Sequence, residues 1–196
     1  MRTLDHYDSN AEAFWEGTRD HDVSQNRAAL VDQLRGSPPF RILDFGCGPG
    51  RDLAAFAAMG HEAVGLDGCL AFVAMARQHS GCEVLHQDFL ALNLPGESFD
   101  GIFANASLFH IPSTDLPRVL RELLVALRPH GVLVASNPRG DGREGWSGGR
   151  YGCYFDLERW RGLFTTTGFD DVSHYYRPKG KPRAEQPWLV TIWRRR

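Results

Sequence analysis

Three closely spaced glycines after a short apolar run give the first indication of chemistry. Residues 44–50 read DFGCGPG, so glycine stands at every second position from 46 to 50 and lets the backbone turn sharply toward a ligand. A dinucleotide-binding loop would need a small residue where Arg51 stands, because a large one crowds the helix against the strand. Asp44 would repel a diphosphate but could hold an ammonium group, directly or through water. The loop therefore predicts a ligand with an α-amino acid end.

Two further acids stand at the ends of the next two expected strands. The carboxylate of Asp67, at the end of VGLD, could accept hydrogen bonds from both hydroxyls of a ribose. The carboxylate of Asp88 could accept from an adenine amino group, while the ring of Phe89 covers the base. Either acid alone could be a helix cap or a turn residue. Three acids at successive strand ends favour a nucleoside site.

The elements that must position these residues follow from an alternation of short apolar runs with helically spaced apolar residues. The expected strands cover residues 41–45, 62–66, 82–86, 99–104, 132–135, 171–176 and 187–193. Helices are expected over residues 52–59 and 70–78, after Ser113 with an apolar stripe from Leu116 to Leu127, and from the cap Asp156 to Thr167. This order predicts a parallel sheet covered on both faces, and the short last link predicts an antiparallel final strand.

The whole chain, residues 1–196, is expected to form one domain with four parts. Residues 1–40 form a polar, helical lead-in that covers the ligand, and residues 41–136 form the binding core. Residues 137–155 form a long loop rich in glycine, arginine and aromatic residues, which favours a substrate-binding lid. Residues 156–196 supply a helix and two strands.

Composition excludes several classes of protein. The chain is 42% hydrophobic with a net charge of −2, which is typical of a globular domain and argues against a nucleic-acid partner. No apolar run is long enough for a membrane helix, and the first residues lack the apolar segment of a secretory signal. The four cysteines show no CxxC spacing, so neither disulfides nor zinc are expected. These features predict a soluble cytoplasmic protein.

Five runs resemble the motif series of the class I S-adenosylmethionine-dependent methyltransferases. They occur in order along residues 41–137 and read LDFGCGPGRDL, GLD, QDF, FDGIFANASLFH and LRPHGVLVASNP. The resemblance implies a Rossmann-like α/β fold with a seven-stranded, mostly parallel sheet of order 3-2-1-4-5-7-6, strand 7 antiparallel and helices on both faces. It also implies S-adenosylmethionine as cofactor, S-adenosylhomocysteine as product and no metal. The cofactor-binding residues would be Tyr7, Trp15, Asp44, Gly46, Cys47, Gly48, Arg51, Asp67, Gly68, Asp88, Phe89 and Asn105.

The flanking segments resemble a narrower group, the methyltransferase module of ovothiol biosynthesis. They read AFWEGTRDHDVSQN, SNPRG, EGWSGGRYG, YYRP and QPWL. That module methylates the π nitrogen of 5-thiohistidine and commonly forms the C-terminal part of a longer enzyme with a sulfoxide synthase. The resemblance implies a small-molecule acceptor, a functional link to a sulfoxide synthase, and neither a nucleic-acid nor a membrane partner. Both a separate protein and an excised domain fit the sequence.

Several polar side chains are candidates for work on the acceptor. His110 could take a proton, and the hydroxyls of Tyr151 and Tyr154 could orient an imidazole ring. The guanidinium of Arg139 could pair with a substrate carboxylate. Further substrate contacts are expected from Gln25, Asn26 and Asn137. Simple core packing of the histidine and the tyrosines, and a surface ion pair of the arginine, stay open as alternatives.

Other functions also stay open. An S-methyltransferase of thiols or metalloids would need no polar set that orients a ring nitrogen. A nucleic-acid methyltransferase would need a basic approach surface, and Asn137-Pro138-Arg139 differs from the Asn-Pro-Pro-aromatic run of amino-methylating enzymes. A module that binds the cofactor without catalysis would keep the same acids and glycines.

Overall fold

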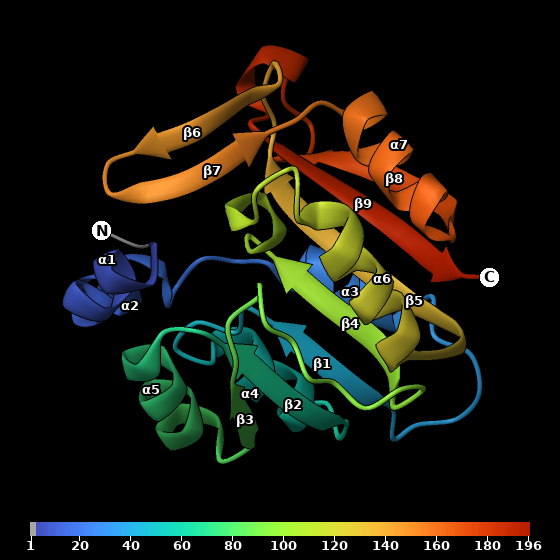
Figure 1. The fold of residues 1–196 in the computed structure, drawn as a ribbon. Coiled ribbons are helices and arrows are strands. Elements are labelled where there is room, and N and C mark those ends of the chain that lie inside the picture. The colour runs from blue at the N-terminus through green and yellow to red at the C-terminus, as the bar shows by residue number, and fades with distance from the viewer. Residues whose placement is uncertain (1–2) are drawn as a thin grey trace.

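The computed structural model describes residues 3–196, in which three helices precede the first strand (Figure 1). In chain order the elements are α1 (Thr3–Ser9), α2 (Ala11–Thr18), α3 (Ser24–Val31), β1 (Arg41–Phe45), α4 (Arg51–Ala58), β2 (Glu62–Asp67), α5 (Leu70–Ser80), β3 (Glu83–His86), β4 (Phe99–Asn105), η1 (Leu108–His110), α6 (Leu116–Ala126), β5 (Leu127–Pro138), β6 (Arg143–Ser147), β7 (Arg150–Tyr154), α7 (Leu157–Thr167), β8 (Phe169–Arg177), η2 (Arg183–Glu185) and β9 (Trp188–Arg195).

Seven of these strands form one twisted sheet in the order β3-β2-β1-β4-β5-β9-β8. Strands β1 to β5 run parallel, and β9 runs antiparallel to both of its neighbours. The predicted Rossmann-like α/β fold and strand order are therefore confirmed, with β8 and β9 as the sixth and seventh strands of the main sheet. The register aligns Pro138, Trp188 and Arg177 across three neighbouring strands.

Helices cover both faces of the sheet because neighbouring strand residues point to opposite sides. Ile42 packs in a cluster with residues of α3, α4 and α5, whereas Leu43 packs in a cluster with residues of α6 and α7. Figure 1 shows α6 and α7 in front of the sheet and α3 behind it. Helices α1 and α2 lie farther out, and α1 contacts both α5 and β7. Among residues 3–196, no helix has the length and apolar content needed to cross a bilayer.

The ends of α6 differ from the sequence prediction. The helix begins at Leu116 with Asp115 as its N-cap residue, whereas Ser113 donates its backbone N–H to the Glu144 carboxylate at 2.7 Å. Leu127, expected in the helix, starts β5 instead and pairs with Phe99 of β4. Pairing with the neighbouring strand overrides the helical spacing of the leucines at this end.

Residues 137–155 also differ from the prediction, because most of this segment is a β-hairpin and not a loop. Strands β6 and β7 pair antiparallel in a separate two-stranded sheet. The turn between them is made by Gly148 and Gly149, whose φ angles of +55° and +79° suit a tight hairpin turn. The hairpin projects toward α1 (Figure 1), and Thr3 Oγ1 accepts a hydrogen bond of 2.9 Å from the backbone N–H of Tyr151.

An aromatic stack joins α7 to the outer strands of the sheet. Phe164 of α7 is fully buried and stacks on Trp193 of β9, with ring centroids 4.4 Å apart. We expect Phe164→Ala to lower the free energy of unfolding by about 3–5 kcal/mol, because it removes a large side chain from a packed core. Leu70→Ala is the control, since Leu70 is 60% exposed. Urea unfolding measures both variants, and equal losses would contradict the assignment.

Candidate functional site

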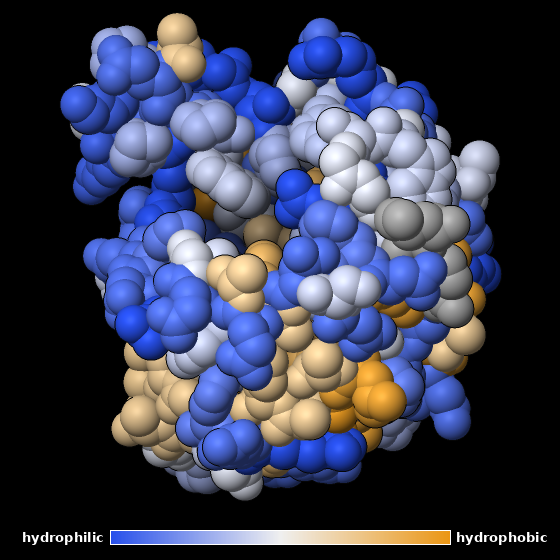
Figure 2. Space-filling view, turned by 90° about the vertical axis from the view of Figure 1, so that its left-hand side faces the viewer, coloured by the Kyte–Doolittle hydropathy of each residue, from blue (hydrophilic) through white to orange (hydrophobic). Residues whose placement is uncertain are grey.

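A cavity of about 900 Å³ opens at the carboxyl edge of the parallel strands, between the N-terminal helices and the hairpin. Figure 2 shows a hollow in this face, with hydrophilic residues around its rim and apolar residues inside. The cavity brings together most of the residues expected at the site. Those that line it are Tyr7, Trp15, Asp44, Gly46, Cys47, Gly48, Arg51, Asp67, Gly68, Asp88, Phe89, Asn105, His110 and Tyr151.

The glycine loop approaches its neighbours so closely that side chains would not fit. Gly46 has a φ of +78°, and a Cβ placed there would lie 2.5 Å from Ser107 Cβ. Gly50 has a φ of +94°, and its Cβ would lie 2.8 Å from Ala76 Cα in α5. Gly48 also has a positive φ and directs its N–H toward Asp67. The loop is therefore a backbone cradle at the edge of the cavity.

Asp44 supplies a buried carboxylate beside this cradle. Its side chain is 2% exposed, and among the described residues its Oδ2 atom has no hydrogen-bond partner. Burial raises the pKa of this carboxyl well above its usual range, and the negative charge of Asp52 adds to the shift. A buried carboxylate oxygen without a donor fits a ligand that brings its own cation, such as an ammonium group.

Asp67 ties the loop to the next helix. Its Oδ2 accepts a 2.9 Å hydrogen bond from the N–H of Gly48, and its Oδ1 accepts one of 2.9 Å from that of Cys69. Burial raises the pKa of Asp67 to about 6, although these backbone bonds pull it down. Each carboxylate oxygen has two acceptor positions, so the backbone bonds leave acceptor capacity for ligand hydroxyls.

The other cofactor candidates have mixed surroundings. Phe89 stacks on Phe45 with ring centroids 4.3 Å apart, and Trp15 stacks on His79 at 4.5 Å. The carboxylate of Asp88 accepts from the backbone N–H of Leu90 at 2.9 Å. Trp15, Asp88 and Phe89 all line the cavity, and Asp88 and Phe89 are the ones expected to hold a base.

Two candidates are committed to protein contacts. The guanidinium of Arg51 pairs with Asp52 at 2.6 Å and donates to the carbonyl of Thr18 at 2.9 Å, which links α4 to the end of α2. Burial raises the pKa of the Cys47 thiol, whose Sγ lies 3.6 Å from the carbonyl oxygen of Gly48. Both side chains line the cavity, but their contacts are with the protein itself.

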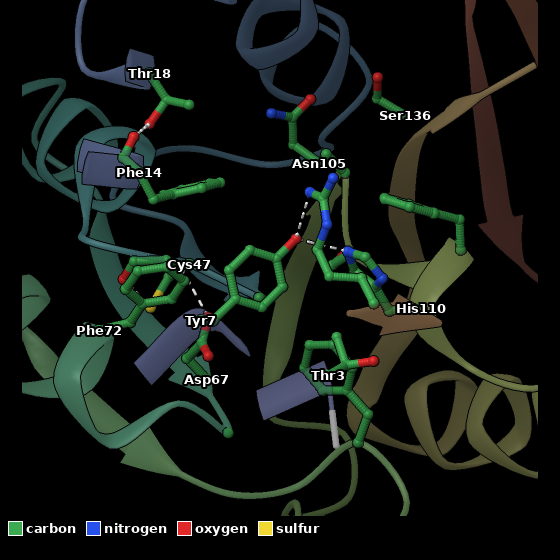
Figure 3. Close-up of a pocket in the computed structure, with 18 of the residues that line it drawn as sticks. Thr3, Tyr7, Phe14, Thr18, Cys47, Asp67, Phe72, Asn105, His110 and Ser136 are labelled. Atoms are coloured by element: carbon green, nitrogen blue, oxygen red, sulfur yellow. Dashed lines mark hydrogen bonds between the residues drawn. The ribbon is translucent and has the colours of Figure 1, made fainter. Parts of the chain in front are cut away.

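His110 and Tyr7 form a hydrogen-bonded pair at the centre of the cavity (Figure 3). The Nδ1 atom of His110 lies 2.6 Å from the carbonyl oxygen of Tyr151, which only accepts, so Nδ1 carries the proton. The Nε2 atom then accepts from the hydroxyl of Tyr7 at 2.9 Å. Burial lowers the pKa of His110 to about 4, so the ring is neutral near pH 7. Arg150 donates to the same Tyr7 oxygen at 3.4 Å.

The side chains of the two candidate tyrosines point to other partners. The hydroxyl of Tyr151 donates to the carboxylate of Glu144 across the hairpin. Burial raises the pKa of the phenol, and the hydrogen bond to Glu144 raises it further. Tyr154 does not line the cavity, and its ring packs against Phe109 with centroids 6.0 Å apart. The hairpin thus reaches the cavity through Trp146, Arg150 and Tyr151 and not through Tyr154.

The four predicted substrate contacts lie outside the cavity lining. Arg139 donates to the carbonyls of Arg183 and Gln186, at 2.8 and 3.2 Å. Asn26 is fully buried and donates to the side-chain oxygen of Asn105 at 2.9 Å, so it positions a residue that does line the cavity. Gln25 accepts a 3.4 Å hydrogen bond at its backbone oxygen, from the Tyr175 hydroxyl, and Asn137 is buried within β5.

Several residues that line the cavity were not among the sequence candidates. They are Thr3, Leu4, Phe14, Thr18, His21, Asp22, Phe72, Ser107, Ser136, Trp146, Arg150, Arg177 and Trp188. Most come from the N-terminal helices, the hairpin and the ends of β8 and β9, which only the tertiary structure brings together. Some of them lie in segments that carry the narrower resemblance, among them Trp146, Arg150, Arg177 and Trp188. No local sequence pattern marks these residues as facing a ligand. Within residues 3–196, no group of three or more His, Cys, Asp or Glu side chains could hold a metal ion.

The comparisons with known proteins agree with this architecture. Residues 42–131 match a family model described as a methyltransferase domain. The chain is 34% identical over 128 residues to 24-methylenesterol C-methyltransferase 2 of Oryza sativa subsp. japonica, covering 61% of this chain and 33% of that protein. It is 28% identical over 152 residues to a ubiquinone biosynthesis O-methyltransferase of Pseudomonas aeruginosa, covering 69% of this chain and 64% of that protein. The chain thus spans less than two thirds of either relative.

A solved structure shares nearly the whole fold. It is the 1,6-didemethyltoxoflavin-N1-methyltransferase of Burkholderia thailandensis, bound to 1,6-didemethyltoxoflavin and S-adenosylhomocysteine, with a TM-score of 0.78. The two chains are 21% identical over 98% of this chain and 86% of the other. Together, the fold and the family match confirm the resemblance to the class I S-adenosylmethionine-dependent methyltransferases at the level of the class. By their names, the two relatives methylate carbon and oxygen, and the structural neighbour methylates nitrogen. The atom that accepts the methyl group must therefore be inferred from the site itself.

The cradle also fits the cofactor of this class on the residues present. The buried Asp44 oxygen, which has no donor within residues 3–196, suits an ammonium group. The glycine loop, which excludes side chains, lets a ligand chain lie close to the backbone. The spare acceptor positions of Asp67 suit the hydroxyls of a ribose.

Asp67→Ala should weaken the binding of S-adenosylhomocysteine by about 1–3 kcal/mol, because two hydrogen bonds to a charged group are lost. In the unaltered protein, affinity should fall as pH drops through about 6, since protonation of Asp67 removes the charge that accepts the hydroxyls. Calorimetry from pH 8 to pH 5 tests both points. Asp170→Ala, an exposed acid paired with Arg196, is the control. Affinity independent of Asp67 would refute the assignment.

Proposed function

We propose that this chain is an S-adenosylmethionine-dependent methyltransferase that acts on a small molecule, and that it methylates the π nitrogen of 5-thiohistidine in the biosynthesis of ovothiol A. The observation that carries the proposal is a single cavity that joins the acid-and-glycine cradle to the Tyr7–His110 pair beneath the hairpin. Cofactor and acceptor could meet in such a space without passing through solvent.

The cofactor would be held at three places. Asp44 would receive its ammonium group, Asp67 its ribose hydroxyls, and Asp88 with Phe89 its adenine. Bound there, S-adenosylmethionine would supply an electrophilic methyl group, because its carbon–sulfur bond breaks with both electrons passing to a neutral thioether. The protein then has to align the acceptor and keep water out.

The Tyr7 hydroxyl is suited to select the reactive form of an imidazole. Its hydrogen is committed to His110 Nε2, so its oxygen can only accept from a ligand. An imidazole that donates its N–H to this oxygen turns the lone pair of its other nitrogen away from Tyr7. His110 is a positioning residue in this scheme, since its low pKa suits it to holding Tyr7 and not to storing a proton. The new N–C bond uses the free lone pair, and no base is needed before transfer.

We also propose which reaction precedes the methylation and where the protein acts. The carbon–sulfur bond of 5-thiohistidine must exist before its ring nitrogen is methylated, so a sulfoxide synthase would act upstream. We further propose a cytoplasmic location and neither a nucleic-acid nor a membrane partner. An S-methyltransferase of small thiols and a cofactor-binding module without catalysis are the competing functions.

An acceptor screen decides between these functions. The protein is mixed with S-adenosylmethionine and, separately, with L-histidine, 5-thiohistidine, small thiols or tRNA, and S-adenosylhomocysteine is quantified. We expect release only with 5-thiohistidine, and NMR of the product should show the methyl group on the ring nitrogen. Asp67→Ala serves as the cofactor-site control. A methyl signal on sulfur would favour the S-methyltransferase, and the absence of S-adenosylhomocysteine with every acceptor would favour the binding module.

Tyr7→Phe tests the orientation of the ring. We expect kcat/KM for 5-thiohistidine to fall by roughly 10- to 100-fold, because one buried hydrogen bond to the ring is lost. Affinity for S-adenosylhomocysteine should change little, since the phenyl ring keeps its contacts with Phe14 and Phe72 at 5.4 Å. Tyr176→Phe is the matched control, because Tyr176 does not line the cavity. Equal kinetics in the two variants would remove Tyr7 from the scheme.

A further inference from the structure

Three guanidinium groups line the described cavity, and they differ in how they are occupied. Arg51 is committed to Asp52 and to the carbonyl of Thr18. Arg150 lies over the ring of Tyr7, 5.9 Å from its centroid, and donates to its hydroxyl. Arg177 donates from Nη2 to the backbone carbonyl of Asp22 at 2.5 Å. A guanidinium has five N–H donors, so this single bond fixes the group while leaving donors for a ligand.

The sheet register puts Arg177 on the acceptor side of the cavity. Arg177 ends β8 and pairs with Trp188, which starts β9 and pairs with Pro138 at the carboxyl end of β5. The acids of the expected cofactor cradle lie at the ends of β1 and β2 and after β3, on the other half of the sheet. A ligand group bound at Arg177 would therefore lie on the opposite side of β4 from the cradle.

A carboxylate stands next to this guanidinium. Asp22 also lines the cavity, and its Oδ1 accepts a 2.9 Å hydrogen bond from the backbone N–H of Ser24. That bond uses one of the acceptor positions of the carboxylate and fixes its orientation at the start of α3. The bond from Arg177 to the backbone carbonyl of Asp22 places the guanidinium near this residue, and the positive charge of Arg177 acts on its carboxylate.

The geometry points to Arg177 and Asp22 as the site that holds the two charged ends of an α-amino acid acceptor, the carboxylate at Arg177 and the ammonium group at Asp22. In an α-amino acid these ends are attached to the same carbon, so they need a cation and an anion held close together. The flat body of the acceptor then lies toward Trp188 and Tyr7. Arg177 takes the role that the sequence had suggested for Arg139, whose guanidinium is held by two carbonyls outside the cavity.

This assignment rests on the proposed function for the identity of the acceptor but is tested without turnover. L-Histidine, histamine and imidazolepropionate share one ring and differ in which charged end they carry. Their affinities are measured by calorimetry in the presence of saturating S-adenosylhomocysteine. We expect L-histidine to bind roughly 10- to 100-fold more tightly than either analogue.

Variants identify which residue binds the carboxylate of the ligand and which binds its ammonium group. Arg177→Met should abolish the preference for L-histidine over histamine, and Arg177→Lys should keep part of it. Asp22→Asn should abolish the preference over imidazolepropionate. Arg139→Met is the matched control and should keep both preferences. Binding of S-adenosylhomocysteine by each variant verifies that it is folded.

The cofactor also carries an α-amino acid end, so one measurement must distinguish binding of the cofactor from binding of the acceptor at this pair. Affinity for S-adenosylhomocysteine should stay within about twofold in Arg177→Met. A tenfold loss there, with the preference for L-histidine intact, would assign the pair to the cofactor and overturn the inference. Preferences that survive in Arg177→Met while 5-thiohistidine is still methylated would overturn the inference alone. Preferences that depend on Arg177 without methylation of 5-thiohistidine would leave the inference standing and reject the proposed function.

Discussion

The carboxylate of Asp67 is the contact on which the arrangement of the cavity depends. Its two oxygens accept from the N–H of Gly48 and the N–H of Cys69, so the loop after β1 and the start of α5 are held by one buried side chain. Leu66, the preceding residue, accepts from the N–H groups of Gly46 and Cys47 through its carbonyl. The end of β2 thus fixes both walls of the cradle. A buried charge is costly unless donors surround it, and these backbone donors fulfil that condition.

The region around Tyr7 and His110, where we propose that the acceptor binds, is held by a chain of neutral hydrogen bonds. The carbonyl of Tyr151 determines the tautomer of His110, and the tautomer determines which way the hydroxyl of Tyr7 points. Tyr151 comes from the hairpin, His110 from the turn after β4, and Tyr7 from α1. The orientation of the Tyr7 hydroxyl therefore depends on how these three segments pack together. Because burial keeps His110 neutral, this arrangement does not change with pH in the physiological range.

The sequence allowed most of the glycine-and-acid cradle to be predicted and little of the proposed acceptor side. The glycines and the acids at the ends of β1 and β2 follow local rules of strand, turn and helix, so Asp44 and Asp67 could be placed from their neighbours in the chain. The role of Asn26 could not, because it acts through Asn105, 79 residues away. The hairpin was missed because residues 143–154 lack the alternation of apolar and polar residues that marks a half-buried strand. Arg177 required the register of β8 and β9, which depends on long-range pairing.

This division also explains why similarity to the class leaves the acceptor open. The family match covers residues 42–131, which hold the cradle and the strands beneath it. Most of the groups that surround the acceptor side lie outside that range, in α1, in the segment before α3, in the hairpin and at the ends of β8 and β9. His110 lies inside the matched range, but its partners Tyr7 and Tyr151 do not. Relatives that modify carbon, oxygen or nitrogen can therefore share the cradle, while the surrounding segments determine which atom faces the methyl group.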